Sequence, residues 1–152
     1  MKTTNRLFIL MGIVLMLLSS NSYAQETHTI TLNVNTSTVD KHNTDETCNF
    51  GQESGVSNKD FTIEVSVGDT IIWEGVSTSS DEVLVNITAI NHEGGINVFN
   101  KNKLHGDGQY PERVIGTVIQ GVPGDEDKYK ISFKMSNRDG TFHIDPILKI
   151  KP

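Results

Sequence analysis

The chain has 152 residues, a formal charge of −6 at neutral pH and one cysteine. The single cysteine excludes an internal disulfide, a four-cysteine zinc site and a CxxC redox pair. The acidic balance, with lysines scattered along the sequence and no basic run, argues against binding to nucleic acid or to an anionic membrane surface.

The first 24 residues predict a cleavable secretory signal peptide. Lys2 and Arg6 precede an apolar stretch at 7–18, and small residues occupy positions 22 and 24. As a helix, this stretch would span about 18 Å, whereas the hydrocarbon core of a bilayer is about 30 Å thick. We therefore expect an exported protein, secreted or periplasmic, that is soluble after cleavage near Ala24 and has no stable membrane insertion.

Residues 25–152 are expected to form a single domain. Of the 13 basic residues, Lys2 and Arg6 leave with the signal peptide, so 11 basic and 19 acidic residues give the domain a formal charge of −8. A chain of this length buries enough apolar surface to fold without disulfides or metals. We expect an N-terminal strand and polar connection at 25–60, followed by the core of the domain at 61–152.

Alternation of apolar and polar residues, the period of a half-buried strand, begins in the N-terminal region. The first strand is expected around residues 30–34. A stretch rich in Asn, Asp, Ser, Thr and Gly follows at 36–60. We expect its Cys48 to be buried as a small apolar residue, and the alternatives are a free thiol or half of an intermolecular bridge. Residues 61–67 and 70–73 then form the clearest strand, turn and strand unit, with a Gly-Asp turn between them.

Further alternation predicts the remaining strands. A long strand at 82–91 restarts at 96–99, and a polar loop follows at 100–112. Later strands are expected at 113–120, 129–135, 142–144 and 147–150. Seven or eight short strands predict an all-β fold, an antiparallel β-sandwich of Greek-key type preceded by the signal peptide. Strand alternation predicts one interior that contains Ile63, Val65, Trp73, Ile131, Phe133 and Phe142.

Two segments resemble cupredoxins. The first, FTIEVSVGDTIIW at residues 61–73, resembles the second hairpin of that family. The second, residues 129–150, contains YKISF, a turn, GTFHIDP and a final ILKI strand, and is similar to the family's closing strands. The resemblance implies a cupredoxin-like β-sandwich.

The copper ligands of cupredoxins are missing from both segments. The family's mononuclear copper centre needs a cysteine before the last strand, a histidine just after it, commonly a methionine beyond, and a second histidine after the Trp strand. Asp145 stands where the cysteine is expected, Pro146 follows it, and no histidine lies at 74–81. We therefore expect no blue-copper centre, no electron transfer and no bound cofactor.

An alternative is an extracytoplasmic metal-binding protein that uses loop side chains. His92, His105 and His143 are the candidate zinc or copper ligands, although none of them forms an HxH or HxxxH pair. Asp107, in the sequence His-Gly-Asp-Gly, is a candidate oxygen ligand for calcium, or simply part of a solvated turn. His143 is expected to face solvent because both of its neighbours are apolar.

No nucleophile elbow and no Cys/His pair at a known spacing occurs in the sequence, so we predict no enzyme. Binding residues concentrate on loops held by a rigid scaffold, and loops 74–81 and 100–112 are the long ones after the N-terminal region. Tyr110, His105 and Asp107 are the candidate ligand contacts. We expect a secreted or envelope-associated binding module whose extracellular or envelope partner is a protein or a glycan.

Overall fold

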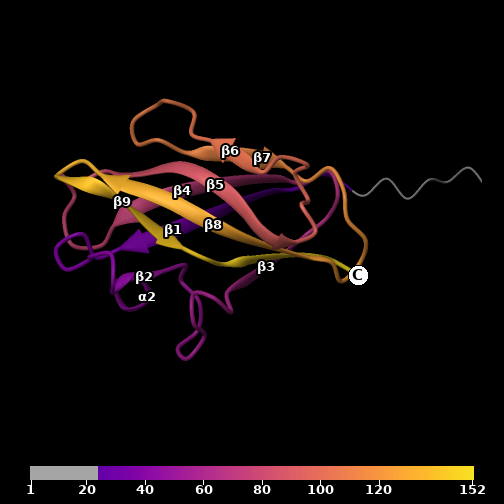
Figure 1. Cartoon of the computed structure of the whole chain (residues 1–152), viewed down its shortest axis with the longest axis horizontal. Coiled ribbons are helices and arrows are strands. Elements are labelled where there is room, and N and C mark those ends of the chain that lie inside the picture. The colour runs from indigo at the N-terminus through magenta and orange to yellow at the C-terminus, as the bar shows by residue number, and fades with distance from the viewer. Residues whose placement is uncertain (1–23) are drawn as a thin grey trace, which may run out of the picture.

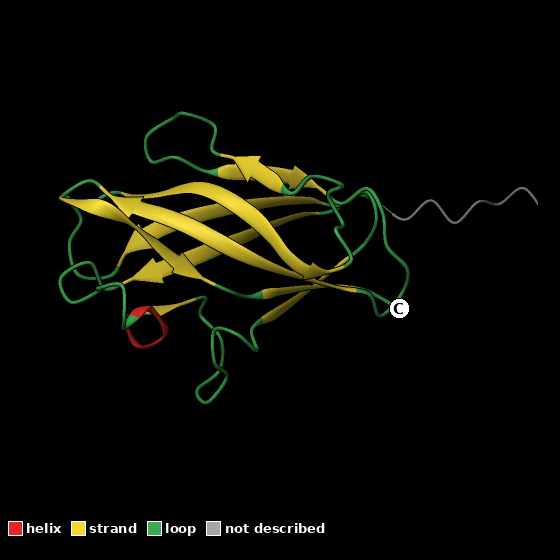
Figure 2. Cartoon of the chain, in the orientation of Figure 1, coloured by secondary structure: helices red, strands yellow, loops and turns green. Residues whose placement is uncertain are grey.

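The structure, a computed structural model, describes residues 24–152 and confirms that they form an all-β fold (Figure 1). The elements, in chain order (Figure 2), are β1 (Thr27–Val34), α2 (Thr44–Thr47), β2 (Cys48–Asn49), β3 (Thr62–Val65), β4 (Thr70–Ser77), β5 (Val85–Gly95), β6 (Lys103–His105), β7 (Val114–Thr117), β8 (Glu126–Met135), β9 (Arg138–Ile144) and β10 (Ile147–Ile150). Apart from Ala24, the predicted signal peptide lies outside the described residues.

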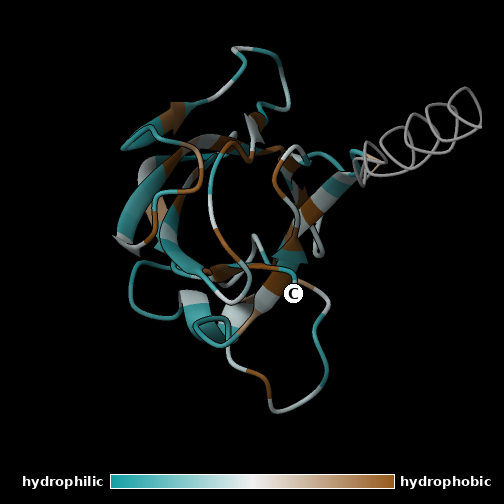
Figure 3. Cartoon of the chain, turned by 90° about the vertical axis from the view of Figure 1, so that its right-hand side faces the viewer, coloured by the Kyte–Doolittle hydropathy of each residue, from teal (hydrophilic) through white to brown (hydrophobic). Residues whose placement is uncertain are grey.

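The strands form one curled sheet with two halves that face each other. One half contains β2, β1 and β4, and the other contains β5, β8, β10 and β3. The order is β2-β1-β4-β5-β8-β10-β3, and β6, β7 and β9 pair with β5, β4 and β8. The halves join where Gly75 of β4 pairs with Val85 of β5. A Cβ atom at position 75 would collide with the Val85 side chain, so this close approach requires glycine. Figure 3, an end-on view, shows the strands in an incomplete ring.

Strand pairing is mixed, so the prediction of an antiparallel sandwich is wrong in this respect. β1 runs parallel to β4, from Thr27 opposite Thr70 to Val34 opposite Ser77, and β3 runs parallel to β10. The unit at 61–73 is therefore not a hairpin, because β3 pairs with β10 in one half of the sheet and β4 pairs with β1 in the other. Alternation shows which side chains face inward, but contacts distant in sequence decide which strands become partners.

Ten strands within residues 24–152 replace the seven or eight that were predicted. Residues 96–99 form no strand, because the chain turns after Gly95 and the Val98 N–H donates to the Asp127 carboxylate at 3.0 Å. Residues 103–105, predicted as loop, form β6 against β5. Both differences depend on partners elsewhere in the chain, which local alternation cannot reveal.

One core fills the space between the two halves, as predicted. Its predicted members Val65, Trp73, Ile131, Phe133 and Phe142 are buried in a single cluster, with Ile63 partly buried against it. Trp73 of β4 and Tyr129 of β8 come from opposite halves, and their ring centroids are 5.7 Å apart in an edge-to-face arrangement. The indole N–H donates to the Tyr129 hydroxyl at 3.2 Å, so the buried polar atoms of this pair are satisfied.

The N-terminal region at 25–60 contributes β1 and β2 to the same sheet. The prediction that Cys48 is buried is confirmed, and burial raises the pKa of its thiol to about 11. At neutral pH this thiol is protonated and unreactive. Between residues 24 and 152, no helix is long and apolar enough to cross a membrane.

Candidate functional site

The segments 74–81 and 100–112, both predicted as loops, meet at one end of the molecule, but residues 74–77 are the end of β4 and only 78–84 connect β4 to β5. Pro111 lies against the end of β4 and the start of β5 and completes a groove of about 240 Å³. The lining residues of this loop groove are Gly75, Val76, Ser77, Ser80, Asp81, Val83, Leu84, Val85 and Pro111. The predicted contact surface therefore contains a groove.

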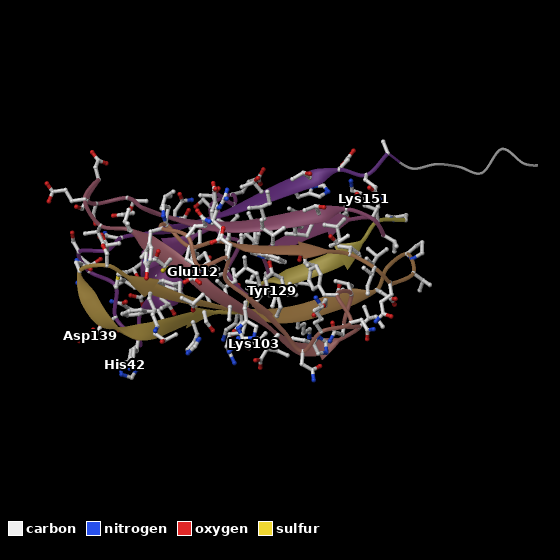
Figure 4. The ribbon with its side chains drawn as sticks, turned by 90° about the horizontal axis from the view of Figure 1, so that it is seen from above. His42, Lys103, Glu112, Tyr129, Asp139 and Lys151 are labelled. Atoms are coloured by element: carbon white, nitrogen blue, oxygen red, sulfur yellow. The ribbon has the colours of Figure 1, made fainter. Side chains whose placement is uncertain are left out.

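Hydrogen bonds to β5 hold the connection between β6 and β7 in place. The Glu112 N–H donates to Oδ1 of Asn86 at 2.9 Å, and the Ile87 N–H donates to the Glu112 carbonyl oxygen at 2.8 Å (Glu112 is labelled in Figure 4). Asn86 is buried, so its amide must be satisfied within the protein. The loop that carries Tyr110 is therefore fixed to the sheet next to its tip.

Asp107 closes the turn at the base of this loop. Its Oδ1 accepts hydrogen bonds from the Gln109 N–H at 3.0 Å and the Arg113 N–H at 3.2 Å, and its Oδ2 lies 3.7 Å from Nε of Arg113. These contacts, with the Gln109 N–H first, lower the pKa of Asp107. Asp107 is thus ionised at neutral pH and orders the loop, while one carboxylate oxygen remains directed at Arg113.

Exposed apolar side chains gather around the loop groove. Tyr110, at the tip of the loop, has 81% of its surface exposed, and Val76 and Leu84 of the groove lining have 39% and 38% exposed. Ser77, Ser80 and Asp81 supply polar groups in the same lining. An apolar surface rimmed by polar residues is typical of a contact site for a ligand or partner.

The histidines of the metal hypothesis lie apart from one another. His105 of β6 pairs with Ala89, Ala89 pairs with Ser132, and Ser132 pairs with His143 of β9. Three inter-strand spacings, about 14 Å in total, therefore separate His105 from His143. His143 is exposed between two buried neighbours, as predicted. Two imidazoles on one zinc ion would have their nitrogens within about 4 Å of each other.

His92, the third of these histidines, is paired with a buried carboxylate instead. Its Nδ1 lies 2.8 Å from Oδ1 of Asp127, whose Oδ2 accepts the Val98 N–H at 3.0 Å. Burial is the largest influence on Asp127 and raises the pKa of its carboxyl group. The pair ties the start of β8 to the corner after β5.

A histidine–carboxylate cluster that the sequence analysis did not single out lies where β1 and β4 begin. One ligand atom each from Glu26, His28 and Asp69 lies within 4.8 Å of the other two. The Asp69 carboxylate contacts His28 Nε2 at 2.8 Å and accepts the N–H groups of Glu26 at 3.0 Å and Ser66 at 2.8 Å. Glu26 is in turn 3.3 Å from Nζ of Lys151.

These contacts already engage both carboxylate oxygens of Asp69, so its first role is to fix the turn before β4. The only signal in the sequence was the acidic residue after the turn glycine, because His28 and Asp69 are 41 positions apart. The parallel pairing of β1 with β4, which local alternation does not reveal, brings them together.

No protein-family model and no curated protein matches this chain. Among solved structures, the chain is similar to the inclusion body protein PixA from Burkholderia cenocepacia J2315, with 12% identity and a TM-score of 0.61 over 86% of this chain and 99% of that one. At this identity the likeness shows the fold alone. A cysteine protease inhibitor from Entamoeba histolytica aligns over 86% of this chain and 100% of its own, with 9% identity and a TM-score of only 0.35.

Proposed function

We propose that this protein is a secreted or envelope-associated, noncatalytic binding module that takes its ligand at the loop groove. The observation that carries the proposal is a groove between the β4–β5 connection and Pro111, with Val76 and Leu84 exposed in its lining and Tyr110 exposed beside Pro111 in the chain. A tyrosine offers a large contact area at a small cost in conformational entropy. The hydrogen bonds from β5 limit the further cost of ordering the loop on binding.

The chemistry of the loop groove fits an extracellular or envelope protein or glycan. A tyrosine ring can stack on the apolar face of a sugar or fill an apolar pocket of a protein, because it is apolar in its body and polar at its tip. Serine hydroxyls and the Asp81 carboxylate in the lining offer partners for ligand hydroxyl or amide groups.

A cupredoxin-like architecture without copper chemistry is part of this proposal. It is supported by the positions of the two resembling segments, because β3 from the first lies beside β10 from the second. Asp145 and Pro146, which occupy the region of the missing copper ligands, connect β9 to β10. The architecture then serves as a scaffold for the loops.

The test compares Tyr110 with another exposed apolar residue that lies outside the groove lining. Protein comprising residues 25–152 is applied to a glycan array and to immobilised envelope and extracellular proteins. Tyr110→Ala should weaken binding of the recovered ligand by about tenfold or more, as for a central aromatic contact. Val122→Ala, which changes a residue 63% exposed, should leave the affinity unchanged.

Stability measurements keep this result interpretable. Both substitutions change exposed sites and should alter the free energy of unfolding by less than about 0.5 kcal/mol. Equal losses of affinity in the two variants, or a bound ligand that neither variant affects, would show that the loop groove is not the binding site.

Extracytoplasmic metal binding is the second candidate function, and the Glu26, His28 and Asp69 cluster is the observation that favours it. One imidazole and two carboxylates form a ligand set that suits zinc. Zinc titration followed by elemental analysis distinguishes the two functions. Stoichiometric zinc that is lost in His28→Gln would support the metal function, and its absence from the unaltered protein would dismiss it.

A further inference from the structure

The lysines that look scattered in the sequence gather on one outer face of the sheet. Along β8, side chains alternate between the two faces of the sheet, and the outer-face set is Glu126, Lys128, Lys130, Ser132 and Lys134, of which Ser132 is buried. Lys103 and His105 of β6 and His143 of β9 lie in the neighbouring strands of the same half. Sheet pairing, rather than sequence proximity, brings these basic side chains to one face.

A hollow of about 510 Å³ crosses this face. Its lining residues, which define the basic groove, are Thr88, Ala89, Asn91, Lys103, Ser132, Lys134, Thr141 and His143 (Lys103 is labelled in Figure 4). The lining thus contains two lysines and no carboxylate. No ion pair within residues 24–152 engages Lys103 or Lys134, whereas the nearby Lys130 lies 3.0 Å from Glu93.

A second hollow, of about 420 Å³, provides an internal comparison. It lies where β8 and β10 begin, and its charged lining residues are Lys59, Asp60, Glu93, Lys128 and Asp145. Three carboxylates there face two ammonium groups, so an anion would meet repulsion as well as attraction. In the basic groove, a bound anion meets cations and hydrogen-bond donors without a carboxylate among the lining residues.

A chain of hydrogen bonds sets the donor pattern in the middle of the basic groove. Asn91 donates through Nδ2 to Oγ of Ser132 at 3.2 Å, and Oγ lies 3.2 Å from Nδ1 of His143. Because Ser132 accepts from Asn91, its own hydrogen is free to point to Nδ1 of a neutral His143. The imidazole proton then lies on Nε2, where it can donate to a ligand.

We propose that the basic groove binds an acidic polysaccharide through its carboxylate or sulfate groups. Lys103 and Lys134 are the main cationic contacts, and Asn91, Thr141 and His143 pair with sugar hydroxyls and ring substituents. The open hollow draws on four strands, β5, β6, β8 and β9, and so accommodates a chain rather than a single small anion.

The lining disfavours nucleic acid as the occupant of this groove. It contains no aromatic ring on which a base can stack, and no arginine to grip a phosphate or a guanine edge with two hydrogen bonds. Separate ammonium groups suit a ligand whose charges are spaced along a chain of neutral hydroxyls. This site lies outside the loop groove and does not depend on the function proposed for it.

The experiment measures the affinity of protein comprising residues 25–152 for polygalacturonate, heparin and neutral dextran at about 20 mM salt, where the Debye length is about 20 Å. Binding to at least one acidic glycan, with none to dextran, is expected. The double variant Lys103→Glu/Lys134→Glu should weaken that binding by about tenfold or more, because two attractive contacts become repulsive. Lys41→Glu/Lys59→Glu changes the net charge equally at exposed sites outside the groove lining and should have less than a threefold effect, roughly.

Three results would overturn the proposal. One is the absence of binding to both acidic glycans, and another is an equal loss of affinity in the two double variants, which would indicate attraction to net charge alone. The third is tighter binding to a single-stranded oligonucleotide of matched charge than to either glycan, which would assign the groove to nucleic acid. Unfolding curves of the two double variants establish that both are folded before they are compared.

Discussion

Two histidine–aspartate pairs in this molecule have the same contact distance, but the pKa values of their aspartates are shifted in opposite directions. His28 contacts Asp69 at 2.8 Å and His92 contacts Asp127 at 2.8 Å. The two carboxylate side chains are similarly hidden, with 2% and 1% of their surfaces exposed. Nevertheless, the pKa of Asp69 is lowered and the pKa of Asp127 is raised.

The difference arises from the deeper burial of Asp127 and from the hydrogen-bond donors around each carboxylate. Burial raises the pKa of Asp69, but the N–H groups of Glu26 and Ser66 and the imidazole of His28 outweigh that effect. At Asp127 burial is the stronger influence, because besides His92 only the Val98 N–H donates to the carboxylate. A histidine partner alone therefore does not decide the ionisation of a buried carboxylate; the depth of its burial and the number of backbone donors decide it together.

Of the substitutions that test this difference between the two aspartates, Asp69→Asn is expected to have the largest effect on stability. The substituted amide has a single acceptor oxygen and directs its NH₂ group at a backbone donor, so a buried N–H loses its partner. We expect a loss of about 3 kcal/mol in the free energy of unfolding at pH 7, as for a broken buried network. Urea melts measure it, with the exposed Asp81→Asn as the control. A loss no larger than that of the control would contradict the role assigned to Asp69.

A smaller effect is expected from Asp127→Asn. The amide oxygen can still accept the Val98 N–H, and its NH₂ group can donate to Nδ1 of a neutral His92. The substitution also removes the cost of burying a charge, so the loss should be about 1 kcal/mol or less. The same melts test this expectation. If Asp127→Asn proves as costly as Asp69→Asn, the contrast in donor number has no energetic consequence.

The smallest and most specific effect is the pH dependence of the stability that is lost in Asp69→Asn and in Asp127→Asn. Asp69, with a lowered pKa in the folded state, contributes stability above the unfolded-state pKa of about 4, and this stability is lost as pH falls through the folded-state pKa. Asp127, with a raised pKa, has the opposite sign: the folded state gains stability as pH falls toward about 4 and its carboxyl group becomes protonated.

Melts between neutral pH and pH 3 separate these signs. The loss caused by Asp69→Asn should shrink below about pH 4, whereas the loss caused by Asp127→Asn should grow as pH falls. Parallel pH profiles for the two variants would show that the two carboxylates have similar folded-state pKa values.

Local sequence patterns correctly predicted burial or exposure where this depends only on which face of a strand, or which loop, carries the residue. Trp73 and Phe133 were expected in the core and Cys48 was expected to be buried, and all three are buried. Tyr110 was placed in an exposed loop because of its polar neighbours, and it is exposed. The Asn-rich and Gly-rich composition of 100–112 likewise indicated the loop, although residues 103–105 within it form β6.

The sequence by itself therefore determined the all-β class, the inward and outward faces of most strands and the loop that carries Tyr110, because alternation and turn residues act over a few positions. Only the tertiary structure decided which strands are neighbours. That choice brings His28 to Asp69 through the parallel pairing of β1 and β4, and it brings Lys103 and Lys134 to one groove across β6, β5 and β8. Pairing depends on the burial of the whole core, to which residues far apart in the chain contribute together, so no local pattern records it.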